Sequence, residues 1–212
     1  MADRALLFID GNNWYHALRE AGLDEVGRLN YARISEKLIG PREWVGTRYY
    51  IGQVRQQSNT QLYADQRRFL AGLTATDQRI TVHLGRLEPR RVVNPAAKEL
   101  AEYMGTLSTR IDTAVFKHLV DLAQRHRQTD VFVEKAVDVM IAVDMVLLAT
   151  RDEYDAAYLL SADGDFTPAV QAVRSLGKKV YAASPGHGAQ LKSAANAFVR
   201  LDAAWFSDCF GS

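Results

Sequence analysis

The sequence predicts an α/β fold in which helices flank a mostly parallel central sheet. Short apolar runs alternate with amphipathic stretches along most of the 212 residues, as expected for strands that alternate with helices. Hydrophobic residues make up 48% of the chain and charged residues 24%, which is ordinary for a globular protein. This length suffices for one well-buried core, so we expect a single domain over residues 1–212.

Individual elements follow from hydrophobic periodicity and from residues that favour strands or end helices. The expected strands are 4–9, 47–54, 80–87, 154–161, 180–183 and 198–201. The expected helices are 12–21, 59–73, 137–149, 166–176 and 190–195.

Residues 92–130 depart from this alternation. Two helices, 96–104 and 109–127, are expected in succession without a strand between them. We interpret the segment as a helical insertion. It either packs on the edge of the sheet or forms a surface for a second copy of the chain or another protein, and the sequence leaves both open.

The single cysteine, Cys209, excludes an internal disulfide framework and a cysteine-based zinc site. It fits a reducing compartment, so we expect a cytoplasmic protein. Charged residues 3 and 4 lead straight into a strand, which argues against a signal peptide. No apolar stretch reaches the ~20 residues that cross a bilayer, so no membrane partner is expected.

Acidic residues follow two apolar strands. Asp10 ends the strand 4–9, and Asp163 and Asp165, separated by one glycine, follow the strand 154–161. Open α/β sheets bind ligands at the C-terminal ends of their strands. Like charges placed close together disfavour one another unless a cation neutralises them. These strand ends therefore predict a site for a hard cation with oxygen ligands.

Two further carboxylates belong to the helix 137–149. Asp138 lies in its first turn, where the helix dipole alone would favour a negative charge by ~0.3–1 kcal/mol. Asp144, six residues on, does not share a face with Asp138. Inside an apolar helix Asp144 needs a partner, which is either an arginine or the metal site that it supports.

Each acid also has a structural explanation when taken singly. Asp10 resembles a turn residue, and Asp165 a helix cap. Together, Asp10, Asp138, Asp163 and Asp165, here named the acidic quartet, occupy three matching points of the predicted topology. Mg²⁺ or Mn²⁺ suits such a site, because both take carboxylates and waters and leave room for a phosphate. The expected chemistry is metal-assisted attack of water on a phosphodiester.

Three motifs carry a resemblance to a known family. Phe8-Ile9-Asp10-Gly11-Asn12-Asn13, Lys135-Ala136-Val137-Asp138-Val139 and Leu160-Ser161-Ala162-Asp163-Gly164-Asp165-Phe166 resemble the acidic motifs of NYN-domain proteins, and most closely those of the LabA-like branch of the PIN-like nuclease superfamily. The resemblance covers residues 4–91 and 131–202.

The resemblance implies a PIN-like three-layer α/β/α sandwich and a metal-dependent ribonuclease that acts on RNA. It implies that the acidic quartet supplies both the catalytic residues and the metal ligands. We expect supporting roles for Asn13, Asp144 and Ser161. Ala162 replaces the family's usual glycine, and 92–130 is longer than the family's linker.

Three arginines after the strand 80–87 are the expected contacts to the RNA backbone. They are Arg86, Arg90 and Arg91, here named the arginine trio. They lie in the basic middle of the chain, and guanidinium groups match phosphate geometry. A solvated charged loop explains them about as well.

Two other functions compete with a ribonuclease. The chain could keep the fold as a catalytically silent RNA-binding or regulatory NYN module. A phosphoryl-transfer domain of the response-regulator or dehalogenase type also puts acids at strand ends, but it needs a lysine at the end of a later strand. Lys178 and Lys179 instead precede theirs.

Overall fold

The computed structural model describes residues 2–56, 59–106, 112–125 and 128–211, without the side chains of Pro89, Arg91, 128–132 and Glu134. The chain divides into two compact units. The main unit comprises Met1–Arg86 and Glu134–Ser212, and the helical unit comprises Leu87–Val133. The expected insertion, 92–130, lies in the helical unit.

One sheet runs through the fold in the order β4-β3-β2-β1-β5-β6-β7. All pairs from β3 to β7 in this order are parallel, so the predicted mostly parallel sheet is confirmed. The strands are β1 (Arg4–Asp10), β2 (Glu43–Gln53), β3 (Ile80–Val93), β4 (Gln128–Lys135), β5 (Ala156–Leu160), β6 (Lys179–Ser184) and β7 (Ala197–Arg200).

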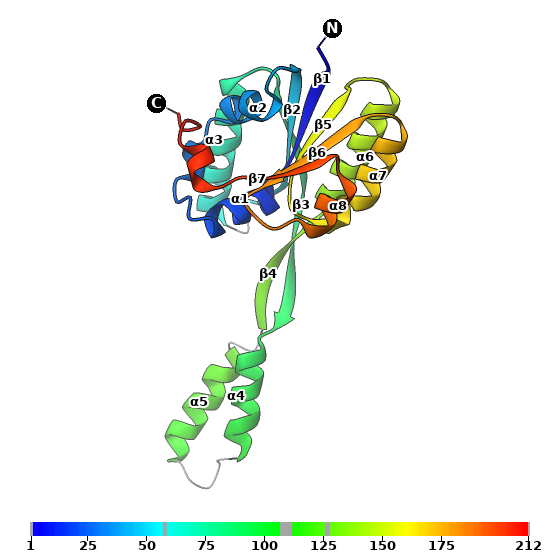
Figure 1. Cartoon of the computed structure of the whole chain (residues 1–212). Coiled ribbons are helices and arrows are strands. Elements are labelled where there is room, and N and C mark those ends of the chain that lie inside the picture. Colours follow the sequence, from blue (N-terminus) through cyan, green and yellow to red (C-terminus); the bar gives the residue numbers. More distant parts are fainter. Residues whose placement is uncertain (1, 57–58, 107–111, 126–127, 212) are drawn as a thin grey trace. The chain divides into compact units, whose positions relative to one another are not determined.

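Helices cover both faces of the sheet in the main unit, which gives the expected three layers (Figure 1). One face carries α1 (Gly11–Glu20), α2 (Tyr31–Ile39) and α3 (Thr60–Thr76), and the other carries α6 (Val137–Thr150), α7 (Thr167–Ser175) and α8 (Ala189–Ala194). Short 3₁₀ helices are η1 (Val26–Arg28), η2 (Gly164–Phe166) and η3 (Ala203–Phe206). The helical unit holds α4 (Pro95–Thr106) and α5 (Thr113–Arg125).

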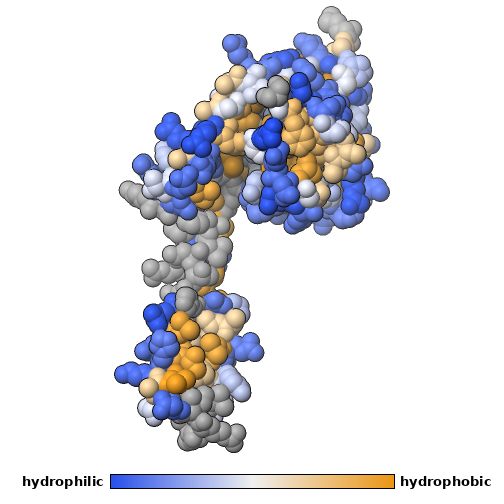
Figure 2. Space-filling view, turned by 90° about the vertical axis from the view of Figure 1, so that its left-hand side faces the viewer, coloured by the Kyte–Doolittle hydropathy of each residue, from blue (hydrophilic) through white to orange (hydrophobic). Residues whose placement is uncertain are grey.

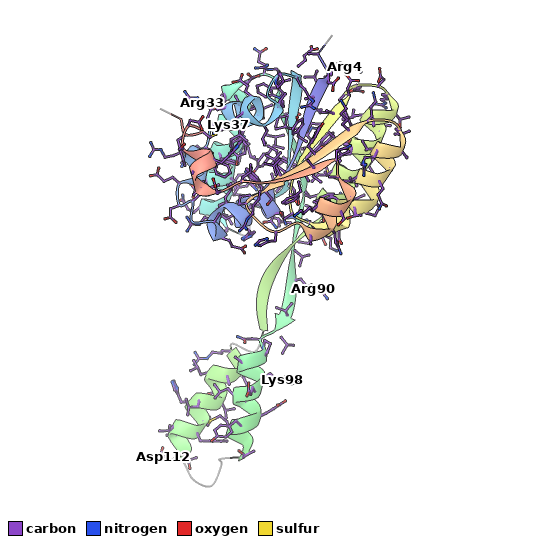
Figure 3. The ribbon with its side chains drawn as sticks, viewed as in Figure 1. Arg4, Arg33, Lys37, Arg90, Lys98 and Asp112 are labelled. Carbon is purple, nitrogen blue, oxygen red and sulfur yellow. The ribbon has the colours of Figure 1, made fainter. Side chains whose placement is uncertain are left out.

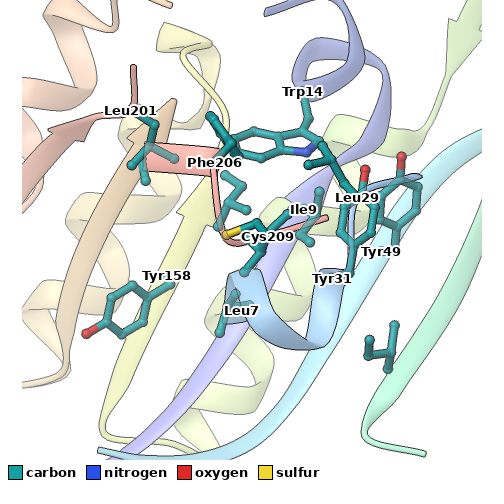
Figure 4. Packing of buried hydrophobic residues seen from close by; sticks show 14 of the residues in the cluster. Leu7, Ile9, Trp14, Leu29, Tyr31, Tyr49, Tyr158, Leu201, Phe206 and Cys209 are labelled. Atoms are coloured by element: carbon teal, nitrogen blue, oxygen red, sulfur yellow. The ribbon is translucent and has the colours of Figure 1, made fainter. Parts of the chain in front are cut away.

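Successive side chains of β1 point to opposite faces of the sheet and pack into two different hydrophobic cores. Leu7 and Ile9 pack with Trp14 and Tyr31 on the α1 face (Figure 4). Phe8 packs against α6 and α7 on the opposite face. Successive strand side chains point to opposite faces, so Asp10 falls on the face of Phe8, toward the start of α6.

No helix among the described residues is long and apolar enough to span a bilayer.

Two features of the structure differ from the expected elements. β3 continues to Val93, so the arginine trio lies within this strand and not after it. Pro89 interrupts the local strand pattern, but pairing with β4 supplies backbone partners that the sequence pattern does not reveal. The helix α2 and the strand β4 are additional elements that were not expected.

Candidate functional site

Two adjacent parallel strands bring the first and last acidic motifs together. β1 ends at Asp10, and its neighbour β5 ends at Leu160, which pairs with Ile9. The segment Ser161–Asp165 therefore leaves the sheet beside Asp10, although about 150 residues of sequence separate them. Strand order thus builds the predicted acidic edge.

Asp10 is almost fully buried, with 3% of its surface exposed. Its Oδ1 caps α1 by accepting a hydrogen bond from the Asn13 backbone N–H at 3.2 Å. Its Oδ2 accepts from the Ser161 hydroxyl at 3.1 Å. Both carboxylate oxygens are thus held by separate elements, and the carboxylate has a defined orientation.

A short chain of hydrogen bonds extends from Asp10 into the loop after β5. Ser161 Oγ accepts from the Asp163 N–H at 3.1 Å, and Asn13 Oδ1 accepts from the Ala162 N–H at 3.1 Å. Asp163 in turn caps η2, because its Oδ1 accepts from the Asp165 N–H at 2.9 Å. Asn13 and Ser161 therefore tie the two acidic motifs to each other.

The acidic quartet interacts electrostatically. The pKa of Asp10 is raised to about 6, chiefly by burial and also by the charges of Asp138 and Asp163, while the hydrogen bonds from Asn13 and Ser161 oppose the shift. The pKa of Asp138 is also raised, by burial first and then by Asp163 and Asp165. Asp10 and Asp138 therefore both lie within the electrostatic field of other members of the quartet.

Close packing between Gly85 of β3 and the start of α6 fixes the position of Asp138. A Cβ on Gly85 of β3 would lie 2.4 Å from Val137 Cγ2 and 3.0 Å from the Lys135 carbonyl oxygen. Only glycine at position 85 leaves space for the first residues of α6. The residue before the helix, Ala136, has φ +71°, a left-handed conformation that is rare for alanine. Strain and close packing together fix the turn that presents Asp138.

Asp144 has the arginine partner that its apolar helix required. Its Oδ2 accepts from the Tyr50 hydroxyl at 2.7 Å and lies 3.3 Å from an Arg48 guanidinium nitrogen. Arg48 Nε also donates to His83 Nε2 at 3.1 Å. These contacts explain Asp144 as part of a separate network. Its link to the quartet is indirect, because Tyr50 pairs with Asp10 in the sheet register.

The quartet fits a divalent cation in the chemistry of its donors. Besides burial, the charges of neighbouring quartet members raise the pKa values of Asp10 and Asp138, and a hard cation would relieve that repulsion. However, no three His, Cys, Asp or Glu side chains among the described residues are grouped closely enough to hold a metal ion by themselves. Mg²⁺ usually keeps several waters, which can bridge carboxylates spaced more widely than direct ligands.

The arginine trio is not gathered at this edge by any contact in the described part of the chain. Arg86 is exposed and belongs to the main unit. Arg90, which Figure 3 labels, is also exposed but belongs to the helical unit. The side chain of Arg91 lies outside the described residues. Their role in RNA binding therefore stays a prediction.

Two hollows beside the acids were not predicted from the sequence. A shallow groove of about 710 Å³ is lined by Asp165, Thr167 and Gln190, among others. A deeper pocket of about 300 Å³ is lined by Asn12 and by several aromatic residues of α1, α2, β2 and α3. No local signal in the sequence marks either hollow, because each combines residues from separate elements.

Comparisons with known proteins agree with this architecture. A solved structure of a protein of unknown function from Vibrio parahaemolyticus has a TM-score of 0.55 and 18% sequence identity, over 95% of this chain and 94% of that chain. At this identity the likeness shows the fold alone. No curated protein matches the chain. The NYN domain family matches residues 4–202, nearly the whole chain. The chain therefore belongs to the NYN domain family of the PIN-like nuclease superfamily.

Proposed function

We propose that this protein is a divalent-metal-dependent ribonuclease of the LabA-like branch that hydrolyses phosphodiester bonds of RNA. The observation that carries the proposal is the mutual electrostatic repulsion of the acidic quartet at the C-terminal edge of the sheet. Burial and neighbouring carboxylates raise the pKa values of Asp10 and Asp138, which disfavours their ionised forms in the folded protein. A ligand-binding role accounts for this cost better than a purely structural one.

The acidic quartet would hold Mg²⁺ or Mn²⁺. When bound, the ion would polarise the phosphate and lower the pKa of a nucleophilic water. Asn13 and Ser161 hold the Asp10 carboxylate in one orientation through its cap and its second oxygen. The hydrogen bonds of Ser161 to both Asp10 and Asp163 keep the spacing between these acids constant. Asn13 and Ser161 are therefore positioning residues.

A nuclease assay on the full chain tests this proposal. RNA labelled at one end is incubated with the protein in Mn²⁺, in Mg²⁺ or in EDTA. We expect cleavage only with metal, and a loss of at least 100-fold in Asp163→Asn. Asp202→Asn is the matched control, because Asp202 also caps a 3₁₀ helix, accepting from the Trp205 N–H at 2.9 Å. Cleavage that persists in EDTA, or in Asp163→Asn, would contradict the proposal.

A catalytically silent RNA-binding or regulatory module is the alternative. It is favoured by one observation, the lack of a ready-made group of three metal-ligating side chains among the described residues. Calorimetric titration with Mn²⁺ separates the two: the ribonuclease binds the ion through the quartet, and Asp163→Asn abolishes this binding. RNA binding without either Mn²⁺ binding or cleavage would favour the silent module.

The phosphoryl-transfer alternative gains no support from the lysines. Lys178 bonds to Asp152 and Asp155, immediately before β5 begins. Lys179 Nζ donates to Asp3 at 2.9 Å, at the start of β1. Both ammonium groups therefore lie at the edge of the sheet opposite the acidic quartet.

We also propose that the helical unit is a contact surface for a second copy of this chain. Ala97, Met104 and Ala123 are the buried hydrophobic residues in its described part, which is a small core for two helices. Tyr103, Val115 and other large apolar side chains are exposed, and Figure 2 shows apolar atoms gathered on this unit.

Light scattering after size exclusion tests this association. Wild type should be a dimer, and Val115→Glu combined with Leu122→Glu should be a monomer that keeps its melting temperature. A monomeric wild type would exclude the second copy as the partner.

For the cellular compartment we keep the cytoplasm as our proposal, supported by the free thiol of Cys209.

A further inference from the structure

A pocket on the α1 face begins one residue after Asp10. Gly11 and Asn12 form part of its rim, and its volume is about 300 Å³. The lining is mainly apolar and aromatic with a few polar groups, the usual character of a site for a small organic ring system. All residues that line the pocket belong to the main unit.

Aromatic rings form the floor and one side of the pocket. Tyr31, Tyr49 and Phe69 pack edge to face, with ring centroids 5.5–6.0 Å apart. Tyr15 of α1 also lines the pocket, yet 48% of its surface is exposed. A large aromatic side chain left half exposed at a pocket mouth offers a stacking surface. Bases of single-stranded nucleic acids stack on such side chains.

Polar groups in the pocket are few and specific. The Tyr31 hydroxyl is fully buried and, within the described part of the chain, has no hydrogen-bond partner. The amide of Gln66 already makes two hydrogen bonds within the protein. Its Oε1 accepts from the Val54 N–H and its Nε2 donates to the Gly52 carbonyl, each at 2.9 Å. Asp65, 47% exposed, also lines the pocket; its carboxylate accepts from Gln61 and pairs with exposed Arg68 at 3.2 Å, and both partners are surface side chains that a ligand can displace.

A carboxylate is an acceptor only, so it selects rings that present donors. Guanine carries two adjacent donors on its Watson–Crick edge, N1–H and the 2-amino group. The other three RNA bases lack such a pair. Asp65 therefore favours guanine over adenine, cytosine and uracil.

We propose that this aromatic pocket binds a guanine base of single-stranded RNA and so anchors the strand beside the acidic edge. The inference rests on the proposed ribonuclease function, since the strand so anchored is the substrate. Asn12 lies in the first turn of α1, two residues after Asp10, so a base held against it would bring its own backbone phosphate toward the quartet. The pocket would thereby select which phosphodiester is cut.

Equilibrium binding to the full chain in EDTA tests the inference without cleavage. The probes are guanosine and inosine 5′-monophosphates, which differ only in the 2-amino group, and a single-stranded RNA decamer with one guanine. We expect guanosine monophosphate to bind more tightly than inosine monophosphate, and the decamer to displace it. Tyr15→Ala should weaken binding about tenfold, because it removes the stacking surface.

Two further variants sharpen the test. Asp65→Asn should narrow the preference for guanosine over inosine monophosphate. Tyr103→Ala is the matched control, because it removes an exposed tyrosine that does not line the pocket, and it should leave binding unchanged. Unchanged affinity in Tyr15→Ala, equal binding of the two nucleotides, or failure of the decamer to compete would each overturn the inference.

The outcomes separate this inference from the proposed function. Guanine-dependent binding of the decamer in a protein that cuts no RNA would support the pocket and contradict the ribonuclease. Metal-dependent cleavage with no preference for sites next to guanine would support the ribonuclease and overturn the pocket.

Discussion

Replacing Asp10 by asparagine should stabilise the metal-free protein at neutral pH. The pKa of Asp10 is raised from 3.8 to about 6 in the folded chain, chiefly by burial. A raised pKa means that the folded state holds the proton more tightly than the unfolded state. Its contribution to stability is therefore fully present below pH 3.8 and is lost as the pH rises through about 6.

The size of the effect follows from this pKa and from the contacts of the side chain. The difference between 3.8 and about 6 corresponds to roughly 3 kcal/mol against the ionised form above pH 6. Asparagine removes the charge and can still accept the α1 cap bond from Asn13. Its amide nitrogen would face Ser161 Oγ and disturb one hydrogen bond, a loss of about 0.5–1.5 kcal/mol. We expect a net gain of about 1.5–2.5 kcal/mol.

Thermal melts in EDTA measure this gain. For a chain of this length, about 1.5–2.5 kcal/mol corresponds to a rise of roughly 3–10 °C in Tm at pH 7.5. The gain should shrink at pH 4.5, where wild-type Asp10 is protonated. Mn²⁺ should stabilise wild type and not Asp10→Asn. A variant that is less stable than wild type at pH 7.5, or a difference independent of pH, would refute the reasoning.

Three other predictions test separate parts of the structure. Replacing the arginine trio with alanine should weaken RNA binding equally for all sequences and reduce the slope of log K against log salt concentration by up to about 2. Unchanged binding at low salt would mean that the RNA backbone binds to another surface. Gly85→Ala should lower stability by about 1–3 kcal/mol and reduce cleavage by displacing Val137, although it alters no acid; Gly72→Ala, with open space around it, is the control in a chemical denaturation series. Tyr31→Phe should keep or raise Tm, since the buried hydroxyl has no partner in the described structure; a clear loss would reveal a hydrogen bond to Tyr49 or Trp14.

Local patterns in the sequence were enough to predict the α/β class and the position of the acids. Hydrophobic periodicity depends on which face of an element is buried, so the runs before Asp10 and Asp163 are readable as strands without knowing their neighbours. Asp10 and Asp163 were predicted in the same way, because Asp-Gly after a buried strand is a local signal, and Asp138 was predicted from its place in the first turn of an apolar helix. The role of the acidic quartet as the metal site remains to be measured.

Tertiary structure decided everything that depends on strand order and on packing between distant segments. β1 lies beside β5, so Ser161 bonds to Asp10; no local pattern encodes that pairing. The partner of Asp144 is Arg48, from a strand almost a hundred residues earlier, and β3 passes Pro89 because β4 pairs with it. The aromatic pocket joins α1, α2, β2 and α3 for the same reason. Such contacts are selected by the free energy of the whole fold, whereas periodicity reports only on the burial of each segment.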